Sequence, residues 1–346
     1  MTVGATTGQH ATAREDSIES IDPRTETRSS GTHLGAVDWL RLIAIFGVAY
    51  YHTFNNWYPD SIVAPYLFAG LHALIAASVY FAAMSRSATS DREIVVKRFH
   101  RLMVPWLAWG ILFTCMAIRS GKFRWSMLWV GGGTHLWFLP FIFVVGCAIA
   151  MARRRGTLVR SPKQAIFWTF LAVAATVIEP HIGPLVTKVE PVWQVVNAMP
   201  SVLMGLAIFA LPATASWSIA IKQLLLFAIA GVLARMFQPD VTLAWTLSAA
   251  VGSALFGVAR LLPLRATPAS SFVARTSFGV YLLHLVTLTI LIRALAKVVP
   301  APLNETGAIA SDPLGLIILA QVVVAVVASL VAVAVLEKTP LRRFIG

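Results

Sequence analysis

Cysteine is scarce in this sequence, which contains only Cys115 and Cys147. Two cysteines, both inside apolar stretches, are too few for a disulfide framework or a multi-cysteine metal site. We therefore expect both to be inert packing residues, and we expect no bound metal.

Charge is scarce as well, because Asp, Glu, Lys and Arg make up 12% of the chain while 58% of it is hydrophobic. Soluble domains are about one quarter charged and about half apolar. Apolar stretches of about 20 residues recur along most of the chain. Each is long enough to cross a hydrocarbon core of about 30 Å as a helix, which rises about 1.5 Å per residue. The lipid bilayer is therefore the expected solvent for most of this protein.

An apolar run that could form the core of a signal peptide is missing from residues 1–33, which are rich in Ser, Thr and mixed charge. We expect a disordered cytoplasmic tail there, followed by one transmembrane domain over residues 34–346. The predicted fold is all-α, a polytopic membrane protein with about ten transmembrane helices in one bundle. The predicted spans are 36–57, 62–84, 103–119, 134–151, 164–180, 192–211, 217–235, 240–262, 272–296 and 314–336.

Acidic residues are fewer than basic ones, with 15 Asp and Glu against 28 Lys and Arg. The basic residues lie in short loops between apolar stretches and not on one continuous face, which indicates membrane topology and not nucleic-acid binding. If the N-terminus is cytoplasmic, 21 of the 28 Lys and Arg residues lie on the cytoplasmic side. Cytoplasmic loops are enriched in Lys and Arg, so we expect both termini on that side.

Ionisable side chains within a membrane are energetically costly, so Arg41 and His52 in the first span are candidate functional residues. They stand eleven residues apart. On a helix this is three turns plus about 20°, which places both on one face about 16 Å apart along the axis. Arg41 could bind an anion at the inner surface while His52 acts as a base deeper in the bundle. The alternative is that Arg41 extends to the interface and His52 packs in a polar seam.

Four further positions are weaker candidates. Arg98 and Arg101, at the inner end of the third span, could grip phosphate oxygens from one helix face, although inner-surface anchoring also explains such pairs. His284 could orient a ligand or be a hydrogen-bonded core residue, and His72 is a weaker candidate of the same kind.

The fourth span begins with two residues that could line an acceptor entrance at its outer mouth, His135 and Trp137. A Trp at this depth is also commonly an interfacial anchor.

Five segments together resemble, in order, the motifs of the bacterial acyltransferase-3 family. They are AVDWLRLIAIFGVAYYHTF at 36–54, RFHRLMVPW at 98–106, HLWFLPFIFVV at 135–145, SFGVYLLH at 277–284 and LEKTPLRR at 336–343. The resemblance implies a protein of about ten helices in the bacterial inner membrane that O-acylates surface polysaccharides, lipid-linked glycans, lipochitooligosaccharides or antibiotics. It also implies a cytoplasmic acyl-CoA donor and essential roles for His52, Arg41, Arg98 and Arg101.

The resulting hypothesis is a membrane-bound O-acyltransferase. It would move an acyl group, with acetyl as the expected group, from acyl-CoA (acetyl-CoA) to a hydroxyl of a cell-envelope glycan or glycolipid. His52 would act as general base or as an acyl-carrying relay. Acylation of a secondary metabolite in the cytoplasm is one alternative. A transporter or flippase is another, but the inverted repeats and interrupted helices typical of that class are not visible in the sequence. Expected partners are membrane lipid and these substrates, without nucleic acid, and the oligomeric state stays open.

Overall fold

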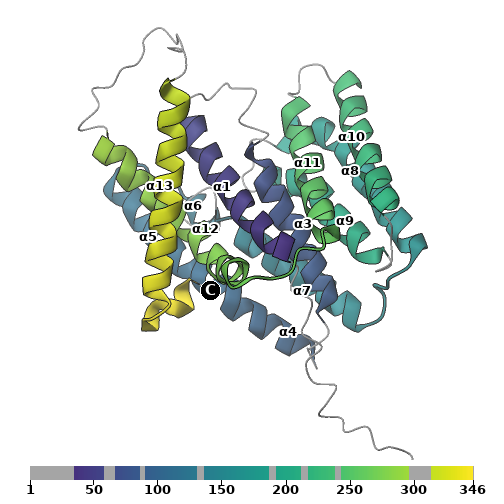
Figure 1. Cartoon of the computed structure of the whole chain (residues 1–346), viewed down its shortest axis with the longest axis horizontal. Coiled ribbons are helices and arrows are strands. Elements are labelled where there is room, and N and C mark those ends of the chain that lie inside the picture. Colours follow the sequence, from purple (N-terminus) through teal and green to yellow (C-terminus); the bar gives the residue numbers. More distant parts are fainter. Residues whose placement is uncertain are drawn as a thin grey trace, which may run out of the picture. The chain divides into compact units, whose positions relative to one another are not determined.

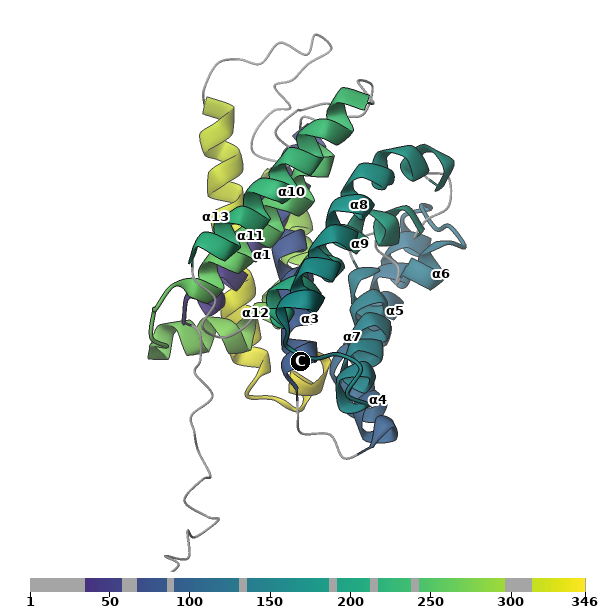
Figure 2. The ribbon, with the colours of Figure 1, turned by 90° about the vertical axis from the view of Figure 1, so that its right-hand side faces the viewer.

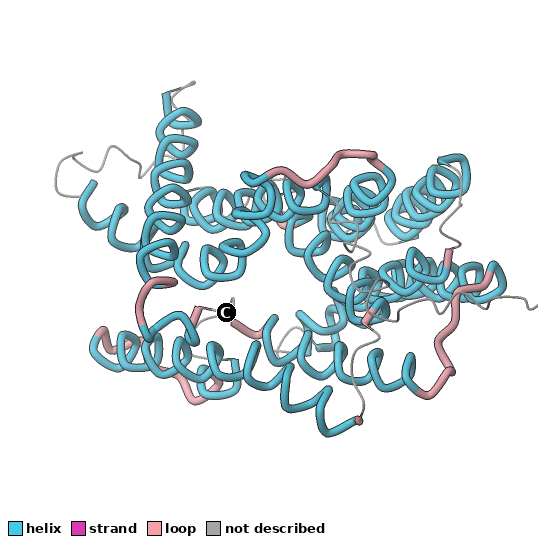
Figure 3. The backbone as a smooth tube through the Cα atoms, turned by 60° about the horizontal axis from the view of Figure 1, so that its bottom comes forward, coloured by secondary structure: helices cyan, strands magenta, loops and turns pink. Residues whose placement is uncertain are grey.

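The computed structural model describes residues 35–57, 67–85, 90–130, 136–186, 192–211, 217–237, 243–295 and 313–345. Within these ranges the regular elements are helices and no strand is formed. The loops that the structure describes are short (Figure 3). The predicted tail at 1–33 and the candidate His135 lie outside the described residues.

Ten long helices account for most of the described chain, if the continuous run from α4 through η1 to α5 is counted as one and the one-turn α6 is left out. The elements are α1 (Gly35–Trp57), α3 (Ala69–Met84), α4 (Asp91–Arg98), η1 (Phe99–Met103), α5 (Val104–Arg119), α6 (Met127–Val130), α7 (Phe138–Arg154), α8 (Pro162–Val186), α9 (Val192–Ala210), α10 (Trp217–Phe237), α11 (Leu243–Leu261), α12 (Pro268–Leu295), α13 (Pro313–Leu336) and η2 (Pro340–Phe344). The predicted all-α class is confirmed.

Several of these helices are apolar enough to cross a membrane. Four of the described helices meet the requirement in both length and composition: Asp91–Arg119, Val192–Ala210, Pro268–Ala294 and Ile318–Leu336. Two more are apolar but shorter, Ala69–Met84 and Leu247–Leu261. A helix bonds all its backbone groups internally, which is what a hydrocarbon environment requires. The chain is therefore an integral membrane protein with multiple apolar helices.

The third helix begins earlier than residue 103, the start that its apolar pattern predicts. The prediction was wrong because the first turns of this helix, α4, are polar. The helix starts at Asp91, and the Ser90 hydroxyl caps it by accepting a hydrogen bond from the Glu93 N–H at 3.1 Å. Ser followed three residues later by Glu is a known helix-start pattern. The segment that carries Arg98 and Arg101 is therefore helical and not a loop.

The centre of the bundle is α3, which packs against α1, α7, α9 and α11 (Figures 1 and 2). Glycines on its neighbours allow this close approach. A Cβ atom added at Gly205 of α9 would lie 2.7 Å from the carbonyl oxygen of Ala76. One added at Gly252 of α11 would lie 2.7 Å from Cβ of His72. Small residues at helix contacts are typical of membrane bundles, where close van der Waals packing holds helices together.

Replacing Gly252 with Ala should destabilise the bundle, because the new methyl group overlaps the backbone of α3. Overpacking of a tight core usually costs about 1 to 3 kcal/mol. We expect a lower melting temperature in thermal unfolding of the purified protein in detergent. Gly257→Ala is the matched control on the same helix, since its Cβ would meet only Ile208, at an ordinary 3.6 Å. Equal melting temperatures for the two variants would contradict the α3–α11 packing described above.

Candidate functional site

Arg41 lies near the start of α1 and is held by two contacts. Its Nη1 atom is 3.3 Å from Oδ1 of Asp38, whose side chain is buried. Its guanidinium carbon lies 5.2 Å from the ring centre of Phe81 on α3, a cation–π contact. These contacts direct the guanidinium toward the junction of α1 with α3.

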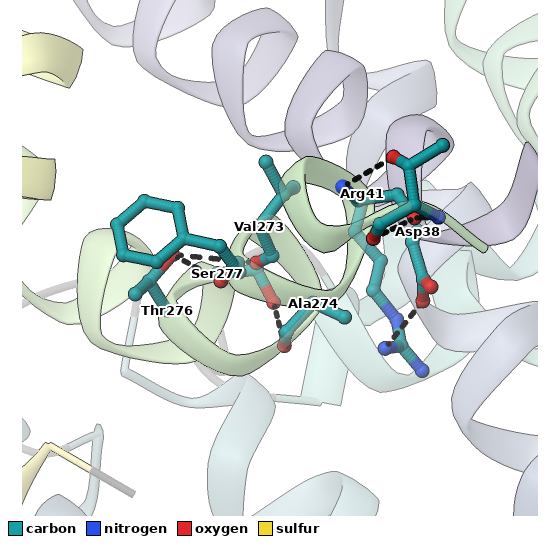
Figure 4. Close-up of polar contacts among 9 residues, drawn as sticks. Asp38, Arg41, Val273, Ala274, Thr276 and Ser277 are labelled. Atoms are coloured by element: carbon teal, nitrogen blue, oxygen red, sulfur yellow. Dashed lines mark hydrogen bonds and ion pairs between the residues drawn. The ribbon is translucent and has the colours of Figure 1, made fainter. Parts of the chain in front are cut away.

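Figure 4 shows the Asp38–Arg41 contact beside the turn of α12 that carries Thr276 and Ser277, and α1 packs against α12. The hydroxyls of Thr276 and Ser277 donate to carbonyl oxygens of their own helix, at 2.9 and 3.0 Å. This self-bonding satisfies Thr and Ser hydroxyls within an apolar bundle. Arg41 and Asp38 thus form the charged part of this corner.

The helix that carries Arg98 and Arg101 changes from an α-helix to a π-helix between these two residues. From Phe99 to Met103 it is a π-helix, in which the Val104 N–H donates to the carbonyl of Phe99. Pro105 follows directly, and since proline has no N–H it cannot bond the carbonyl of Arg101 as an α-helix requires. Single π-turns within α-helices are frequent at functional sites.

Arg98, the last residue of α4, and Arg101, within the π-helix, have different surroundings. Arg98 is half-buried against α7, where a Cβ on Gly146 would lie only 2.5 Å from its Nη1 atom, so Gly146 leaves the space that the guanidinium occupies. Arg101 is exposed. Its charge lies close enough to repel those of Arg41 and Arg98.

Arg41, Arg98 and Arg101, which we call the arginine cluster, therefore bring three positive charges together from two helices. Among the described residues, the ion pairs include one for Arg41 and none for Arg98 or Arg101. Forked guanidinium donors without carboxylate partners suit the binding of phosphate groups. The cluster is a candidate anion site.

His52, near the other end of α1, is paired with His284 of α12. The two imidazole ring centres are 5.6 Å apart and the ring planes are tilted by 35°. His284 is fully buried, and its Nδ1 lies 2.5 Å from the carbonyl oxygen of Tyr281. The structure thus brings together two histidines that are far apart in the sequence. Along α1, His52 is about 16 Å from Arg41 at the helical rise.

Aromatic rings connect this histidine pair to the start of α7. The ring of Tyr281 lies 5.8 Å from that of His284 and 5.6 Å from that of Phe138. Trp137 precedes Phe138, is 5% exposed and packs on Phe141 at 5.5 Å. The described structure therefore places Trp137 in a buried aromatic cluster next to the histidine pair, and its role in an acceptor entrance stays a prediction.

His72 joins two helices in the bundle centre. Its Nδ1 lies 2.8 Å from Oγ of Ser201 on α9, and both side chains are buried. Hydrogen bonds between helices are a common stabilising contact within membranes. Among the residues that the structure describes, no group of three or more His, Cys, Asp or Glu could hold a metal ion.

A comparison with known protein families identifies a match. A sequence model of a protein family, described as an acyltransferase domain, matches residues 34–337. Neither the curated proteins nor the solved structures include a match to this chain.

Proposed function

The chain belongs to the acyltransferase 3 family, and we propose that it transfers an acyl group, with acetyl as the expected group, from cytoplasmic acyl-CoA to a hydroxyl of a cell-envelope glycan or glycolipid. The observation that carries this proposal is the position of a candidate anion site and a histidine pair at two levels of the same helix, α1. A donor with phosphates at one end and a thioester at the end of a long arm fits that arrangement.

The arginine cluster is the proposed binding site for the CoA phosphates. Three guanidiniums, two of which lack ion-pair partners among the described residues, provide the charge-assisted donors that phosphate oxygens accept. The pantetheine arm of the bound donor would then run along α1 for about 16 Å, which sets the thioester beside His52.

His52 is the proposed general base. It takes the proton of the acceptor hydroxyl while that oxygen attacks the thioester carbonyl carbon. The carbon–sulfur bond then breaks, and the protonated His52 returns the proton to the CoA thiolate. Histidine suits this task because its ordinary pKa lies near neutral pH. A burst of CoA release in the absence of acceptor would instead indicate an acyl group carried by the histidine.

The proposed acceptor is a hydroxyl of a surface or lipid-linked glycan, reached from the end of α1 that carries His52. Mass spectrometry of cell-envelope glycans from cells with and without the protein tests this directly. Acyl groups missing only from the deletion strain support the glycan acceptor. An unchanged glycan profile, together with loss of an acylated small metabolite, would assign the acceptor to the cytoplasm.

We expect both termini to face the cytoplasm of a bacterial cell, with the protein in the inner membrane. In a variant whose own Cys115 and Cys147 are replaced by Ser, single cysteines at positions 126 and 185 should react with an impermeant maleimide on intact cells. A single cysteine introduced at 157, between α7 and α8, is the control and should react only after permeabilisation. The opposite pattern would reverse the membrane orientation and the donor side.

Replacing Arg98 or Arg101 with Ala should weaken acetyl-CoA binding by about 1.5 to 3 kcal/mol, the range for hydrogen bonds to charged groups. Lys should restore only part of the affinity, since it lacks the planar fork. Isothermal titration of the protein in nanodiscs measures both effects. Arg92→Ala removes an exposed charge from the same helix and is the matched control.

Gly146→Val gives a second test of this site in which every charge is kept. Its side chain would occupy the space of the Arg98 guanidinium. Acetyl-CoA affinity should therefore fall although Arg98 is still present. If both Gly146→Val and the Arg98/Arg101 double Ala variant bind acetyl-CoA with wild-type affinity, these arginines do not bind the donor and act only as membrane anchors.

Replacing His52 with Ala should lower turnover by about 10²- to 10⁴-fold, as expected for the loss of a general base, while folding and acetyl-CoA binding persist. The assay is CoA thiol release by purified protein in nanodiscs, with acetyl-CoA as donor and methyl glucoside as hydroxyl probe. Arg41→Ala should act mainly through donor binding, so a higher acetyl-CoA concentration should recover part of its activity. His181→Ala, an exposed histidine on α8, is the control. Wild-type turnover by His52→Ala would place the base elsewhere.

A further inference from the structure

The ring of His284 on α12 contacts the ring of His52 on α1. Among the described ring pairs, this is the contact that joins two histidines from different helices. The side chain of His284 is fully buried, in an environment where an imidazole is costly unless it has polar partners. At a ring-centre distance of 5.6 Å, the edges of the two rings lie within a few ångströms of each other. The packing of α1 against α12 therefore holds two imidazoles side by side at the level of the proposed chemistry.

The hydrogen bond of His284 to Tyr281 determines where its ring proton lies. The partner of Nδ1 is a backbone carbonyl oxygen at 2.5 Å, and a carbonyl oxygen can only accept a hydrogen bond. The neutral imidazole must therefore carry its proton on Nδ1, which leaves Nε2 with a lone pair. In this tautomer His284 is an acceptor at its second nitrogen.

The surroundings of His284 hold the ring in place. One turn further along α12, the Thr287 hydroxyl lies 2.9 Å from Oγ of Ser329 and 3.2 Å from the carbonyl oxygen of Ala325, both on α13. On the other side, the Tyr281 ring packs on Phe138 of α7. Contacts with α1, α7 and α13 thus fix this part of α12.

We propose that His284 is a positioning residue for His52, which it orients and whose protonated form it stabilises during acyl transfer. The inference rests on the proposed role of His52 as base. When His52 takes the proton of the acceptor hydroxyl it becomes an imidazolium, and the lone pair of the neighbouring neutral imidazole accepts a hydrogen bond from it. When the carbon–sulfur bond breaks, His52 passes that proton to the CoA thiolate and the pair returns to its neutral state. A buried partner that orients a catalytic histidine and stabilises its charged form is a recurring device in acyl transfer.

Nitrogen-15 NMR of the histidine-labelled protein in lipid bilayers tests the geometry without any acceptor. The signals lost in His284→Phe should show a proton on Nδ1 and none on Nε2. The signals of His52, identified by their loss in His52→Ala, should shift in His284→Phe and stay in place in His72→Phe. A proton on Nε2 of His284, or His52 signals that do not move, would overturn the proposal.

Turnover of acetyl-CoA with methyl glucoside tests the catalytic consequence. His284→Phe keeps a packed ring but has no lone pair, so kcat should fall by about 10- to 100-fold, the range seen when a residue that orients a metal-binding histidine is lost. KM for acetyl-CoA should not change, because the arginine cluster is intact. His284→Gln, which retains an acceptor, should recover part of kcat. His72→Phe, which also removes a buried imidazole, should keep wild-type kcat.

The outcomes separate this inference from the function on which it rests. If His52→Ala is inactive and His284→Phe keeps wild-type kcat, the base assignment stands and the positioning role is wrong. If His284→Phe and His284→Gln have equally low kcat, the loss comes from the changed shape of the side chain and not from the missing lone pair. The proposal is then also wrong. If His52→Ala turns over at the wild-type rate, the proposed base itself fails.

Discussion

Close packing of α1 between α3 and α12 is the interaction on which the candidate site depends. A Cβ on Gly70 of α3 would lie 2.9 Å from Cα of Ala44, so only glycine permits the observed contact between the two backbones. This contact brings Phe81 of α3 to the guanidinium of Arg41, and the packing of α12 against α1 brings His284 to His52. Neither polar side chain is held by α1 alone. In a bilayer, where helices gain little from burying apolar surface against each other, such close contacts are what fix their positions.

The distribution of charge follows the cost of each group in an apolar environment. Guanidiniums keep their charge at any physiological pH, and the arginine cluster lies at the end of α1 where that helix begins. Imidazoles can be neutral, and the histidine pair consists of the fully buried His284 and the partly buried His52. One helix therefore carries a permanently charged group and a titratable one at two levels. This order suits a donor whose charged end stays near water while its reactive end enters the bundle.

The sequence predicts the helices well because an apolar run of sufficient length has one stable form in a membrane. It does not predict the start of the third helix, since α4 is polar and its signal is the capping pair Ser90 and Glu93. The pairing of His52 with His284 could not be predicted either. These residues are separated by most of the chain, and helical periodicity describes neighbours within a helix only. The SFGVYLLH motif indicated that His284 is of interest but not which residue it contacts.

The two arginines of the third helix differ in exposure, and the π-turn begins between them. In a regular helix, residues three apart are neighbours on the helix surface. Here Arg98 is half-buried in the space beside Gly146, while Arg101 is exposed and Arg41 is anchored by Asp38. The positive charge of the arginine cluster thus extends from solvent into the bundle. A charged ligand would meet Arg101 first and would then be drawn toward the guanidiniums nearest α1, because oriented charge attracts and guides an anion over several ångströms. The arginine cluster therefore connects the proposed donor's entry to the helix that carries the proposed base.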